Sequence, residues 1–332
     1  MKEKTIEELL ANLTRECDLG EIIEDVVPVS GGFMHRMYKV TTDKGIYAVK
    51  HLNAEIMKRP NVFDNYERAE KIEAILEQSD IPMVPALVLR GKKMQQMEGQ
   101  FFYVFRWQNG KITDWNNISK SQCNMAGNIL GRIHAIEPKN VEAEPSEVSR
   151  IDWQGYVQKA KEEDSVIAIL LEEKKELFSY AERQLNNARA ALPAMQCLSN
   201  EDMDPKNVMW ENGSPWVIDL ECLDYGNPVA HVMILALQWA GTVTDSLDVD
   251  KLVAFFEGYL EAYDNGFRGY GNIVGVAYNW VDWLEYNIQR ALGNCVDEAE
   301  QELGISEVRN TIRRMEYLRE VEPQIKKALQ SL

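Results

Sequence analysis

The sequence predicts an α+β protein with strands in its first third and helices in most of the remainder. Between residues 22 and 105, short runs of apolar and β-branched residues are separated by turn residues such as Asp43-Lys44-Gly45. From Ser119 onward, apolar residues recur mostly at helical spacing. We therefore expect a small antiparallel sheet, followed by a larger and mostly helical part.

The strand-rich part is expected to form a five-stranded antiparallel sheet with an opening helix and one further helix. Helices are predicted over residues 6–17 and 64–78, where apolar residues fall on one face. The pattern predicts strands over residues 26–29, 37–41, 46–50, 84–89 and 100–105. Alternation stops after Phe105, so we place the domain boundary after Trp107, giving domains 1–107 and 108–332.

The second part has two features beyond its helical pattern. Helices are predicted over residues 165–192, 229–240, 249–263, 273–292 and 305–329. His134 falls on an apolar helix face, where a hydrogen-bonded core histidine is favoured over a ligand. Trp280 and Trp283 could stack on a ligand, although packing between helices is the favoured interpretation of that aromatic cluster.

Composition and charge narrow the class of protein. The 332 residues are 45% hydrophobic and 27% charged, which is ordinary for a globular protein. The net charge of −17 argues against nucleic acid or an anionic membrane as a partner, and it suits a cationic ligand or simple solubility. No apolar run is long enough for a membrane span, and the five cysteines are scattered, so we expect a cytoplasmic protein with reduced thiols. The oligomeric state is left open.

One polar stretch, residues 198–225, carries the strongest functional signal. Asp202 is followed at the fifth position by Asn207, and Asp219 comes directly after an apolar run. Between them the pattern predicts a hairpin, with arms at residues 208–210 and 216–218. Two carboxylates and an amide brought together in this way would suit Mg²⁺, and the order Asp, Asn, Asp matches a kinase catalytic segment. A polar surface loop beside a hairpin is the alternative.

A second signal lies in the strand-rich part. Lys50 ends an apolar strand, where a cation must find a partner or border a cleft. Upstream of it, Ser30-Gly31-Gly32 forms a turn that could present backbone amides to phosphate. Glu70, on the following helix, is the expected partner of Lys50, with Glu67 and Glu73 as competitors. The segment of Phe105 and Trp107 could offer backbone groups to an adenine edge.

Together these residues resemble the aminoglycoside phosphotransferase and choline kinase superfamily. The family segment His-Gly-Asp-Leu-His-Pro-x-Asn is similar to Asn200-Glu201-Asp202-Met203-Asp204-Pro205-Lys206-Asn207, and its Ile-Asp-Phe/Leu-Glu to Ile218-Asp219-Leu220-Glu221. The resemblance implies a two-lobe, protein-kinase-like fold, with a nucleotide-binding first lobe. It also implies that Asp202 is the catalytic base, Asn207 and Asp219 hold Mg²⁺, and Lys50, steadied by Glu70, contacts the phosphates.

Three residues depart from the family pattern. Asn200 and Glu201 stand where the family has His and Gly, and His231 stands near the place of an Asp on the next helix. These departures motivate the alternative of a kinase-like binding or regulatory protein without turnover. A protein kinase is disfavoured because no Ala-Pro-Glu segment follows Asp219.

We therefore expect a phosphotransferase that uses ATP, or GTP, with Mg²⁺ to phosphorylate a hydroxyl of a small molecule. An antibiotic such as an aminoglycoside, a sugar or amino sugar, and a choline-like amino alcohol all remain open as acceptors. The candidate acceptor contacts are Asp224, Trp280, Trp283 and Glu285.

Overall fold

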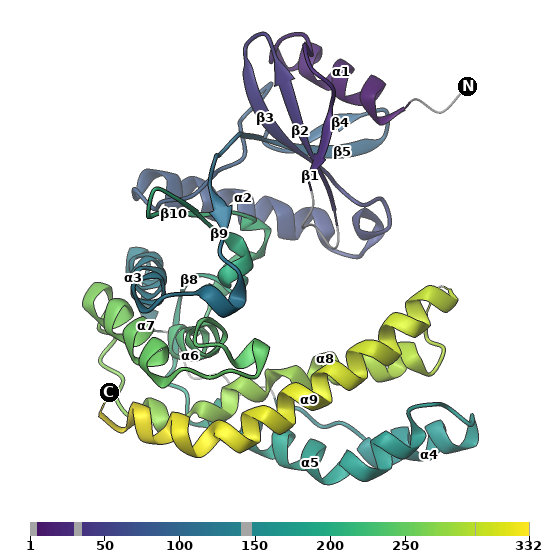
Figure 1. Ribbon diagram of the computed structural model, residues 1–332, viewed down its shortest axis with the longest axis vertical. Helices are drawn as coiled ribbons and strands as arrows, with labels where there is room; N and C mark the ends of the chain where they lie inside the picture. The colour runs from purple at the N-terminus through teal and green to yellow at the C-terminus, as the bar shows by residue number, and fades with distance from the viewer. Residues whose placement is uncertain (1–4, 30–34, 141–147, 296, 332) are drawn as a thin grey trace. The chain divides into compact units, whose positions relative to one another are not determined.

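The chain divides into two compact units, and Figure 1 labels their helices and strands on a ribbon coloured by residue number. The computed structural model describes residues 5–29, 35–140, 148–295 and 297–331. The first unit comprises residues 1–112 and 206–224, and the second comprises 113–205 and 225–332. The segment from Asn207 to Asp219 thus belongs with the N-terminal residues. The predicted α+β fold class, with a small antiparallel sheet and a larger helical part, is confirmed.

The first unit is built on a five-stranded antiparallel sheet with strand order β1-β2-β3-β5-β4. Its strands are β1 (Val27–Val29), β2 (Arg36–Thr42), β3 (Gly45–His51), β4 (Gln95–Met97) and β5 (Gln100–Arg106). The central pair is β3 and β5, in which Lys50 lies opposite Tyr103. The number of strands agrees with the sequence-based prediction.

One of the predicted strands, residues 84–89, was wrong. Pro85 has no N–H, and this segment makes only isolated contacts, such as the 2.8 Å hydrogen bond from Leu87 N to Val104 O. The fifth strand is β4, which lies between the predicted strands 84–89 and 100–105. Glu98 and Gly99, with φ of 50° and 82°, form a two-residue turn into β5 that favours such a hairpin.

A helix covers each face of this sheet. The helix α1 (Ile6–Glu16) packs on residues of one face that include Val49 and Val104, and Thr5 caps its first turn. The helix α2 (Val62–Gln78) lies on the other face, where Tyr66 packs near Tyr103. Because strand side chains alternate, Lys50 and Tyr103 point away from the α1 core and toward α2. A short 3-10 helix, η1 (Ile56–Lys58), precedes α2.

A second small sheet in this unit contains the predicted hairpin. It has the order β10-β9-β6, with β6 (Lys111–Ile112), β9 (Val208–Glu211) and β10 (Ser214–Val217). Asn212 and Gly213 have φ of 52° and 83°, which fits a tight Asn-Gly hairpin turn. The short 3-10 helices η3 (Pro205–Asn207) and η4 (Leu220–Cys222) flank the hairpin. The predicted hairpin is confirmed.

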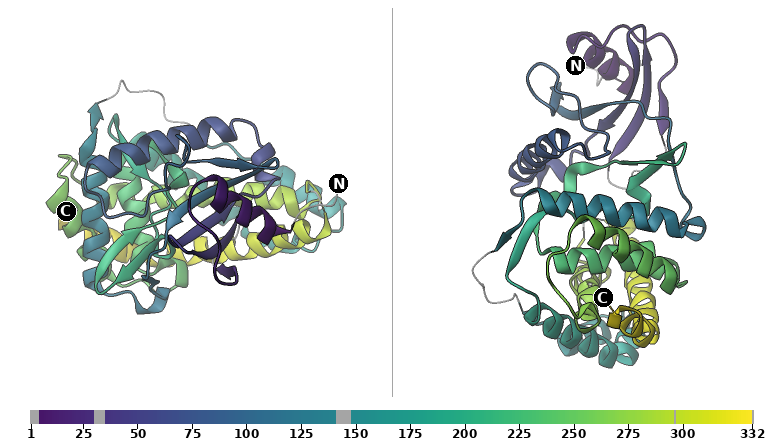
Figure 2. Two further views of the ribbon diagram at one scale, coloured as in Figure 1. Left: turned by 90° about the horizontal axis from the view of Figure 1, so that it is seen from above. Right: turned by 90° about the vertical axis from the view of Figure 1, so that its left-hand side faces the viewer.

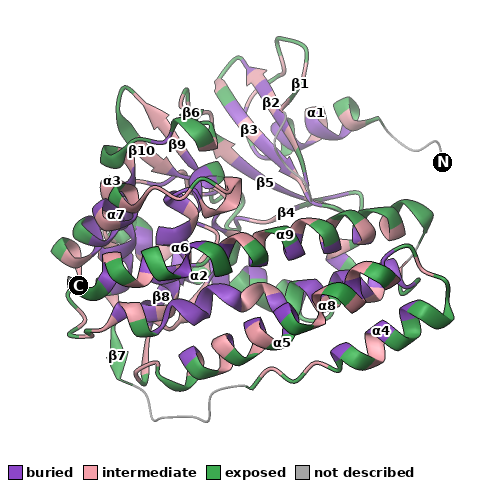
Figure 3. Ribbon diagram, turned by 60° about the horizontal axis from the view of Figure 1, so that its bottom comes forward, coloured by how far each residue is buried: buried purple, intermediate pink, exposed green. Residues whose placement is uncertain are grey.

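The second unit centres on closely packed helices. The helices α3 (Lys120–Ile136) and α7 (Val249–Ala262) run side by side in Figures 1 and 2. Gly127 and Gly258 let their backbones approach. A Cβ added at either glycine would lie 2.0 Å from a carbonyl oxygen of the other helix. The helix α6 (Pro228–Trp239), capped by Asn227, packs on both and is mostly buried in Figure 3.

The second unit contains further helices. They are α4 (Trp153–Glu162), α5 (Ala168–Ala190), α8 (Trp280–Ala291) and α9 (Glu298–Ala328), of which α8 and α9 pack together. The helix predicted over residues 273–292 begins instead with a 3-10 segment, η7 (Val274–Asn279). A small sheet, unforeseen from the sequence, has the order β11-β8-β7. Its strands are β7 (Lys139–Asn140), β8 (Met195–Asn200) and β11 (Leu223–Gly226).

The remaining 3-10 segments of the second unit are short. They are η2 (Trp115–Asn117), η5 (Thr242–Thr244), η6 (Tyr270–Asn272) and η8 (Leu329–Ser331). Within the described ranges, none of the helices combines the length and the apolar character that crossing a membrane requires.

Candidate active site

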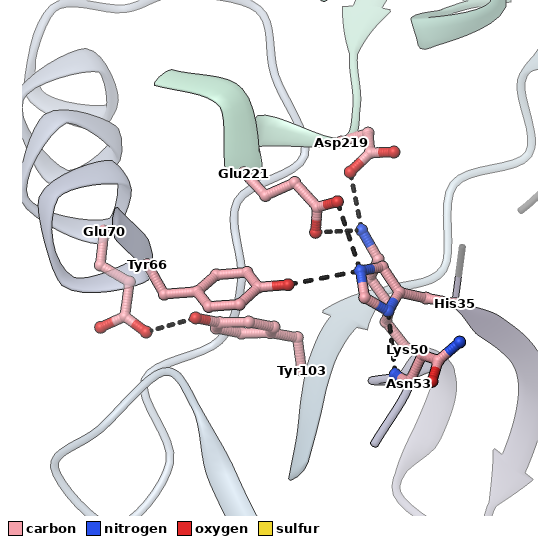
Figure 4. A network of polar contacts seen from close by, with 8 residues as sticks. All are labelled: His35, Lys50, Asn53, Tyr66, Glu70, Tyr103, Asp219 and Glu221. Atoms are coloured by element: carbon pink, nitrogen blue, oxygen red, sulfur yellow. Dashed lines mark hydrogen bonds and ion pairs between the residues drawn. The ribbon is translucent and has the colours of Figure 1, made fainter. Parts of the chain in front are cut away.

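Lys50 is held between two carboxylates in the first unit. Its Nζ lies 2.7 Å from Oδ1 of Asp219 and 2.6 Å from Oε2 of Glu221, as Figure 4 shows. The lysine side chain is only 9% exposed, whereas that of Asp219 is 36% exposed. The buried ammonium of Lys50 is therefore paired with the carboxylate of Asp219, which solvent can reach.

The two carboxylates keep Lys50 charged. Burial by itself would lower the pKa of Lys50, but Asp219 and Glu221 outweigh it, so the pKa is raised. Burial would likewise raise the pKa of Glu221, yet its contacts with His35 and Lys50 hold that pKa below its usual value. A charged lysine facing two carboxylates is a suitable starting state for binding an anion, because phosphate could take the place of a carboxylate at Nζ.

The expected Lys50–Glu70 pair is replaced by other contacts. Glu70 accepts a hydrogen bond of 2.7 Å from the hydroxyl of Tyr103, and Tyr103 lies between Glu70 and Lys50. Of the two competitors, Glu67 pairs with Lys71 at the surface. The sequence correctly placed Glu70 on the side of α2 that faces the sheet. Tyr103 lies opposite Lys50 in the sheet and forms the hydrogen bond with Glu70 in place of Lys50.

The third glutamate, Glu73, serves the fold. It is buried, accepts a 2.6 Å hydrogen bond from the backbone N of Ala86 and pairs with Lys93. A cavity of about 30 Å³ lies between α2 and the sheet and is lined by Lys50, Glu70 and Phe105, among others. That volume holds a water molecule and not a nucleotide. Trp107 lies elsewhere, with Nζ of Lys39 5.1 Å from its ring centre.

The hairpin brings Asn207 close to Asp219. Val208 pairs with Val217, and the backbone N of Ile218 donates a 2.9 Å bond to the carbonyl of Asn207. Asp219 follows directly and adopts a left-handed conformation, with φ of 59° and ψ of 65°. This conformation is strained for a residue with a side chain, and such strain is frequent at functional sites. A carboxylate and an amide oxygen are hard donors that fit Mg²⁺, which takes its other ligands from phosphate and water.

Two further contacts anchor this segment to the sheet side of the unit. The backbone N of Val84 donates to the carbonyl of Val217 at 2.9 Å, and the N of Val217 donates to Pro82 O at 2.9 Å. The residues after α2 thus fix the end of β10, from which Asp219 and Glu221 extend. This explains how carboxylates so distant in sequence reach Lys50.

Three residues of this network were not predicted as site residues from the sequence. They are His35, Tyr66 and Glu221. Nδ1 of His35 accepts a 3.0 Å bond from the backbone N of Asn53, which leaves Nε2 3.5 Å from Oε1 of Glu221. The hydroxyl of Tyr66 lies 3.3 Å from the same Nε2. In the sequence, only the position of Glu221 two residues after Asp219 pointed to this network, because no motif surrounds His35 or Tyr66. Ser30, Gly31 and Gly32 lie outside the described residues.

Asp202 belongs to the second unit, in the turn after β8. Its backbone N donates a 3.1 Å bond to Oδ1 of Asn200, which is fully buried. The carbonyl of Met203 accepts a 2.9 Å bond from the indole of Trp239 on α6. The turn that carries Asp202 is therefore fixed from both sides, and Asn200 supplies one of these bonds.

A chain of buried polar groups lies beneath this turn. Oγ of Ser199 is 2.7 Å from Nδ1 of His231 and 3.0 Å from Nε2 of His134. Nδ1 of His134 lies 2.9 Å from the hydroxyl of Tyr259. His134 is fully buried, which lowers its pKa well below the usual value, so it is neutral. It is thus the hydrogen-bonded core histidine that the sequence favoured. Nε2 of His231 lies 2.8 Å from Oε1 of Glu201.

A second cavity, of about 500 Å³, lies within the second unit. It is bounded by the end of α5, the turn after β8, and α6, η7 and α8, and its lining includes Glu201, His231, Trp280 and Trp283. Its size is typical of small-molecule sites. Two of the four candidate acceptor residues thus share this cavity.

The other two candidates have different contacts. Glu285 accepts a 2.8 Å bond from Tyr156, and Asp224, in the first unit, pairs with Arg68 at 2.8 Å.

Comparisons with known proteins give a family match and several similar solved structures. The model of a family described as the phosphotransferase enzyme family matches residues 25–270. No curated protein sequence matches the chain significantly. Among solved structures, a spectinomycin phosphotransferase in complex with ADP and spectinomycin is 14% identical, with full coverage of both chains and a TM-score of 0.66.

Two other structures show the same fold. An amicoumacin kinase in complex with AMP-PNP and Ca²⁺ is 12% identical over 94% of this chain and 96% of that chain, with a TM-score of 0.59. An ethanolamine kinase of Plasmodium vivax is 16% identical over 88% of this chain and 83% of that chain, with a TM-score of 0.57. At these identities the likeness concerns the fold.

Proposed function

Because the chain belongs to the phosphotransferase enzyme family, we propose that it transfers the γ-phosphoryl group of ATP to a hydroxyl of a small molecule, with Mg²⁺. The observation that carries this proposal is the contact of Lys50 with Asp219 at 2.7 Å, beside the hairpin that brings Asn207 to the same place. A buried cation next to hard oxygen donors suits a metal–triphosphate.

Each of these side chains would have one role in the transfer. Lys50 would bind oxygens of the α- and β-phosphates, and Asn207 and Asp219 would hold Mg²⁺, whose charge would offset that of the phosphates. Glu221 and His35 keep Lys50 in place from the opposite side. Asp202 orients the acceptor hydroxyl and takes its proton while the bond between the γ-phosphorus and the ADP oxygen breaks. The products are ADP and a phosphate monoester.

We further propose that the acceptor binds in the 500 Å³ cavity of the second unit. Glu201 lines this cavity and directly precedes Asp202, so their Cα atoms are about 3.8 Å apart. Support for a nucleotide donor comes from the ADP and AMP-PNP complexes of the similar structures. ATP and GTP are compared directly in the experiment below.

The test is acceptor-dependent release of ADP or GDP across a panel of aminoglycosides, other antibiotics, sugars and amino alcohols. We expect turnover with at least one class, and a loss of about 10³-fold or more in Asp202→Asn, which keeps the shape of the side chain but removes the base. Asp164→Asn, at an exposed turn, is the matched control and should retain full activity.

A thermal melt in the presence of ATP and Mg²⁺ accompanies the assay. Both the parent protein and Asp202→Asn should be stabilised by the nucleotide. A protein that binds nucleotide but never transfers phosphate to any acceptor would support the alternative of a kinase-like binding protein. Unchanged turnover in Asp202→Asn would remove this residue from its role.

A further inference from the structure

Each of the two carboxylates that line the proposed acceptor cavity already has a basic side chain as its partner. Two carboxylates line it, Glu201 and Asp282. Glu201 lies 2.8 Å from Nε2 of His231, and Oδ2 of Asp282 lies 3.4 Å from Nη2 of Arg189. His231 and Arg189 line the same cavity. The chain as a whole is strongly acidic, but both carboxylates of this cavity lining have a basic partner. The lining therefore presents no excess of unpaired carboxylates to a ligand.

A further cation, the guanidinium of Arg314, lies next to Trp280 in the cavity wall. The guanidinium of Arg314 lies 4.7 Å from the ring centre of Trp280, and Arg314 borders a neighbouring cavity that shares Gln238 and Trp280 with the first. This contact occupies one face of Trp280 with a positive charge. A multiply charged ammonium compound would thus meet paired carboxylates and an aromatic ring that already has a cation.

The remaining lining suits an uncharged ring. Apolar side chains such as Ile234 and Val276 form much of the wall, together with the indoles of Trp280 and Trp283. Indole faces pack against the C–H faces of sugar-like and other flat rings without requiring charge.

The wall also holds hydrogen-bonding capacity that is not used. Oε1 of Gln238 and Oδ1 of Asn279 are buried and have no hydrogen-bond partner among the described residues, although both residues line the cavity. Rotation of either side-chain amide would present its unpartnered oxygen to a bound ligand. Both unpartnered atoms are acceptors, and a hydroxyl of an uncharged ring can donate to either of them without bringing a charge into the cavity.

We propose that the acceptor is an uncharged, hydroxyl-bearing ring compound, such as a neutral sugar or glycoside, and that multiply cationic acceptors are disfavoured. The inference rests on the proposed function for the transfer step, and on the cavity alone for binding. One hydroxyl of the ring would face Asp202, while the ring packs on Trp280 and Trp283.

The experiment uses the full chain and acceptors matched in shape but not in charge. Glucose and glucosamine share a ring and differ only at one position, which carries a hydroxyl in the first and an ammonium in the second, and phenyl glucoside, kanamycin and choline extend the two classes. Binding is measured without nucleotide through quenching of tryptophan fluorescence, and transfer through acceptor-dependent ADP release. We expect the neutral members to bind, and kcat/KM for the neutral sugar of the matched pair to exceed that of the amine by at least about tenfold, with KM independent of salt.

A substitution in the wall tests the charge argument directly. Asn279→Asp has nearly the same shape and adds a carboxylate without a cation partner, so the preference for the neutral member of the pair should fall by at least about tenfold. Asn272→Asp adds the same charge at an exposed position outside the cavity lining and should leave the preference unchanged.

The outcomes separate this inference from the proposed function. Preferential binding and phosphorylation of the cationic members, abolished in Asp202→Asn, would overturn the neutral acceptor and leave the phosphotransferase standing. Binding of the neutral members without any transfer would support the inference about the cavity and count against the proposed function. Failure of both classes to quench the fluorescence would overturn the inference.

Discussion

Oε1 of Glu201 lies 2.8 Å from Nε2 of His231, so two residues that depart from the family pattern contact each other. The contact lowers the pKa of the Glu201 carboxyl group. On its other side, His231 meets Ser199 at 2.7 Å, and Ser199 directly precedes Asn200, which binds the backbone of Asp202. The departures thus form one connected set that supports the turn of Asp202, the proposed catalytic base.

We predict that His231→Leu slows transfer by about 10- to 100-fold, as the loss of a supporting contact commonly does. Ser199 and Glu201 would lose their partner, and the turn that carries Asp202 would loosen. The measurement is steady-state kinetics with saturating ATP, in which kcat falls while the KM for ATP stays nearly constant. Glu201→Gln keeps an oxygen that can accept from Nε2 and should lose much less activity. Equal kcat in all three proteins would show that the contact does not position the turn.

Lys50→Met should remove the cation that meets the phosphates. We expect a fall in kcat of about 10²- to 10³-fold, because two carboxylates would then face the phosphates without a counter-charge. The stabilisation by ATP in a thermal melt should shrink as well. Lys71→Met, which removes an exposed lysine of α2 that pairs with Glu67, is the matched control. A Lys50→Met protein with full turnover would contradict the assigned role.

Removal of the divalent metal is expected to stop transfer, and Mg²⁺ should restore it. Asp219→Asn should reduce activity by about 10²-fold or more at fixed Mg²⁺, because it replaces the one carboxylate among the two proposed metal ligands. Asparagine tolerates the left-handed conformation at this position, so the backbone should stay unchanged. The readout is ADP release against Mg²⁺ concentration after treatment with EDTA. Asp224→Asn, at a partly exposed pair with Arg68, serves as control and should keep the parent Mg²⁺ dependence.

A pH-dependent stability is expected at Glu322 of α9. This buried carboxylate accepts 2.9 Å bonds from Tyr180 and Tyr278 and lies 2.6 Å from Nζ of Lys326. Burial would raise the pKa of Glu322, but these three partners together lower it below 4.5. Its contribution to stability is therefore complete above pH 4.5 and is lost as the pH falls through the folded-state value.

Glu322→Gln should accordingly cost about 1–3 kcal/mol of unfolding free energy at pH 7 and less at pH 3.5. Urea unfolding of both proteins at the two pH values measures the difference. Glu316→Gln, which breaks a more exposed pair with Lys174, should change stability by about 0.5 kcal/mol or less at either pH. A difference for Glu322→Gln that grows as the pH falls would contradict a lowered pKa of Glu322 in the folded state.

Local pattern predicted most elements, but not their partners. The hairpin around Asn212 and Gly213 and the helix over residues 229–240 followed from turn chemistry and helical spacing, which act over a few residues. The assignment of a strand to residues 84–89 failed because Pro85 cannot donate to a ladder, so the apolar run pairs only at isolated points. The partner of Lys50 was also missed, since Tyr103 lies opposite it only when the sheet has formed.

By itself, the sequence determined the α+β class, the family segment around Asp202, Asn207 and Asp219, and the burial of His134, because each depends on residues close together in the chain. Only the tertiary structure decided that Asp219 and Glu221 flank Lys50, that Glu201 meets His231, and that the carboxylates of the acceptor cavity are already paired. These facts concern charges brought together from distant segments. Their interaction depends on the packing that sets distance and burial, which no local pattern encodes.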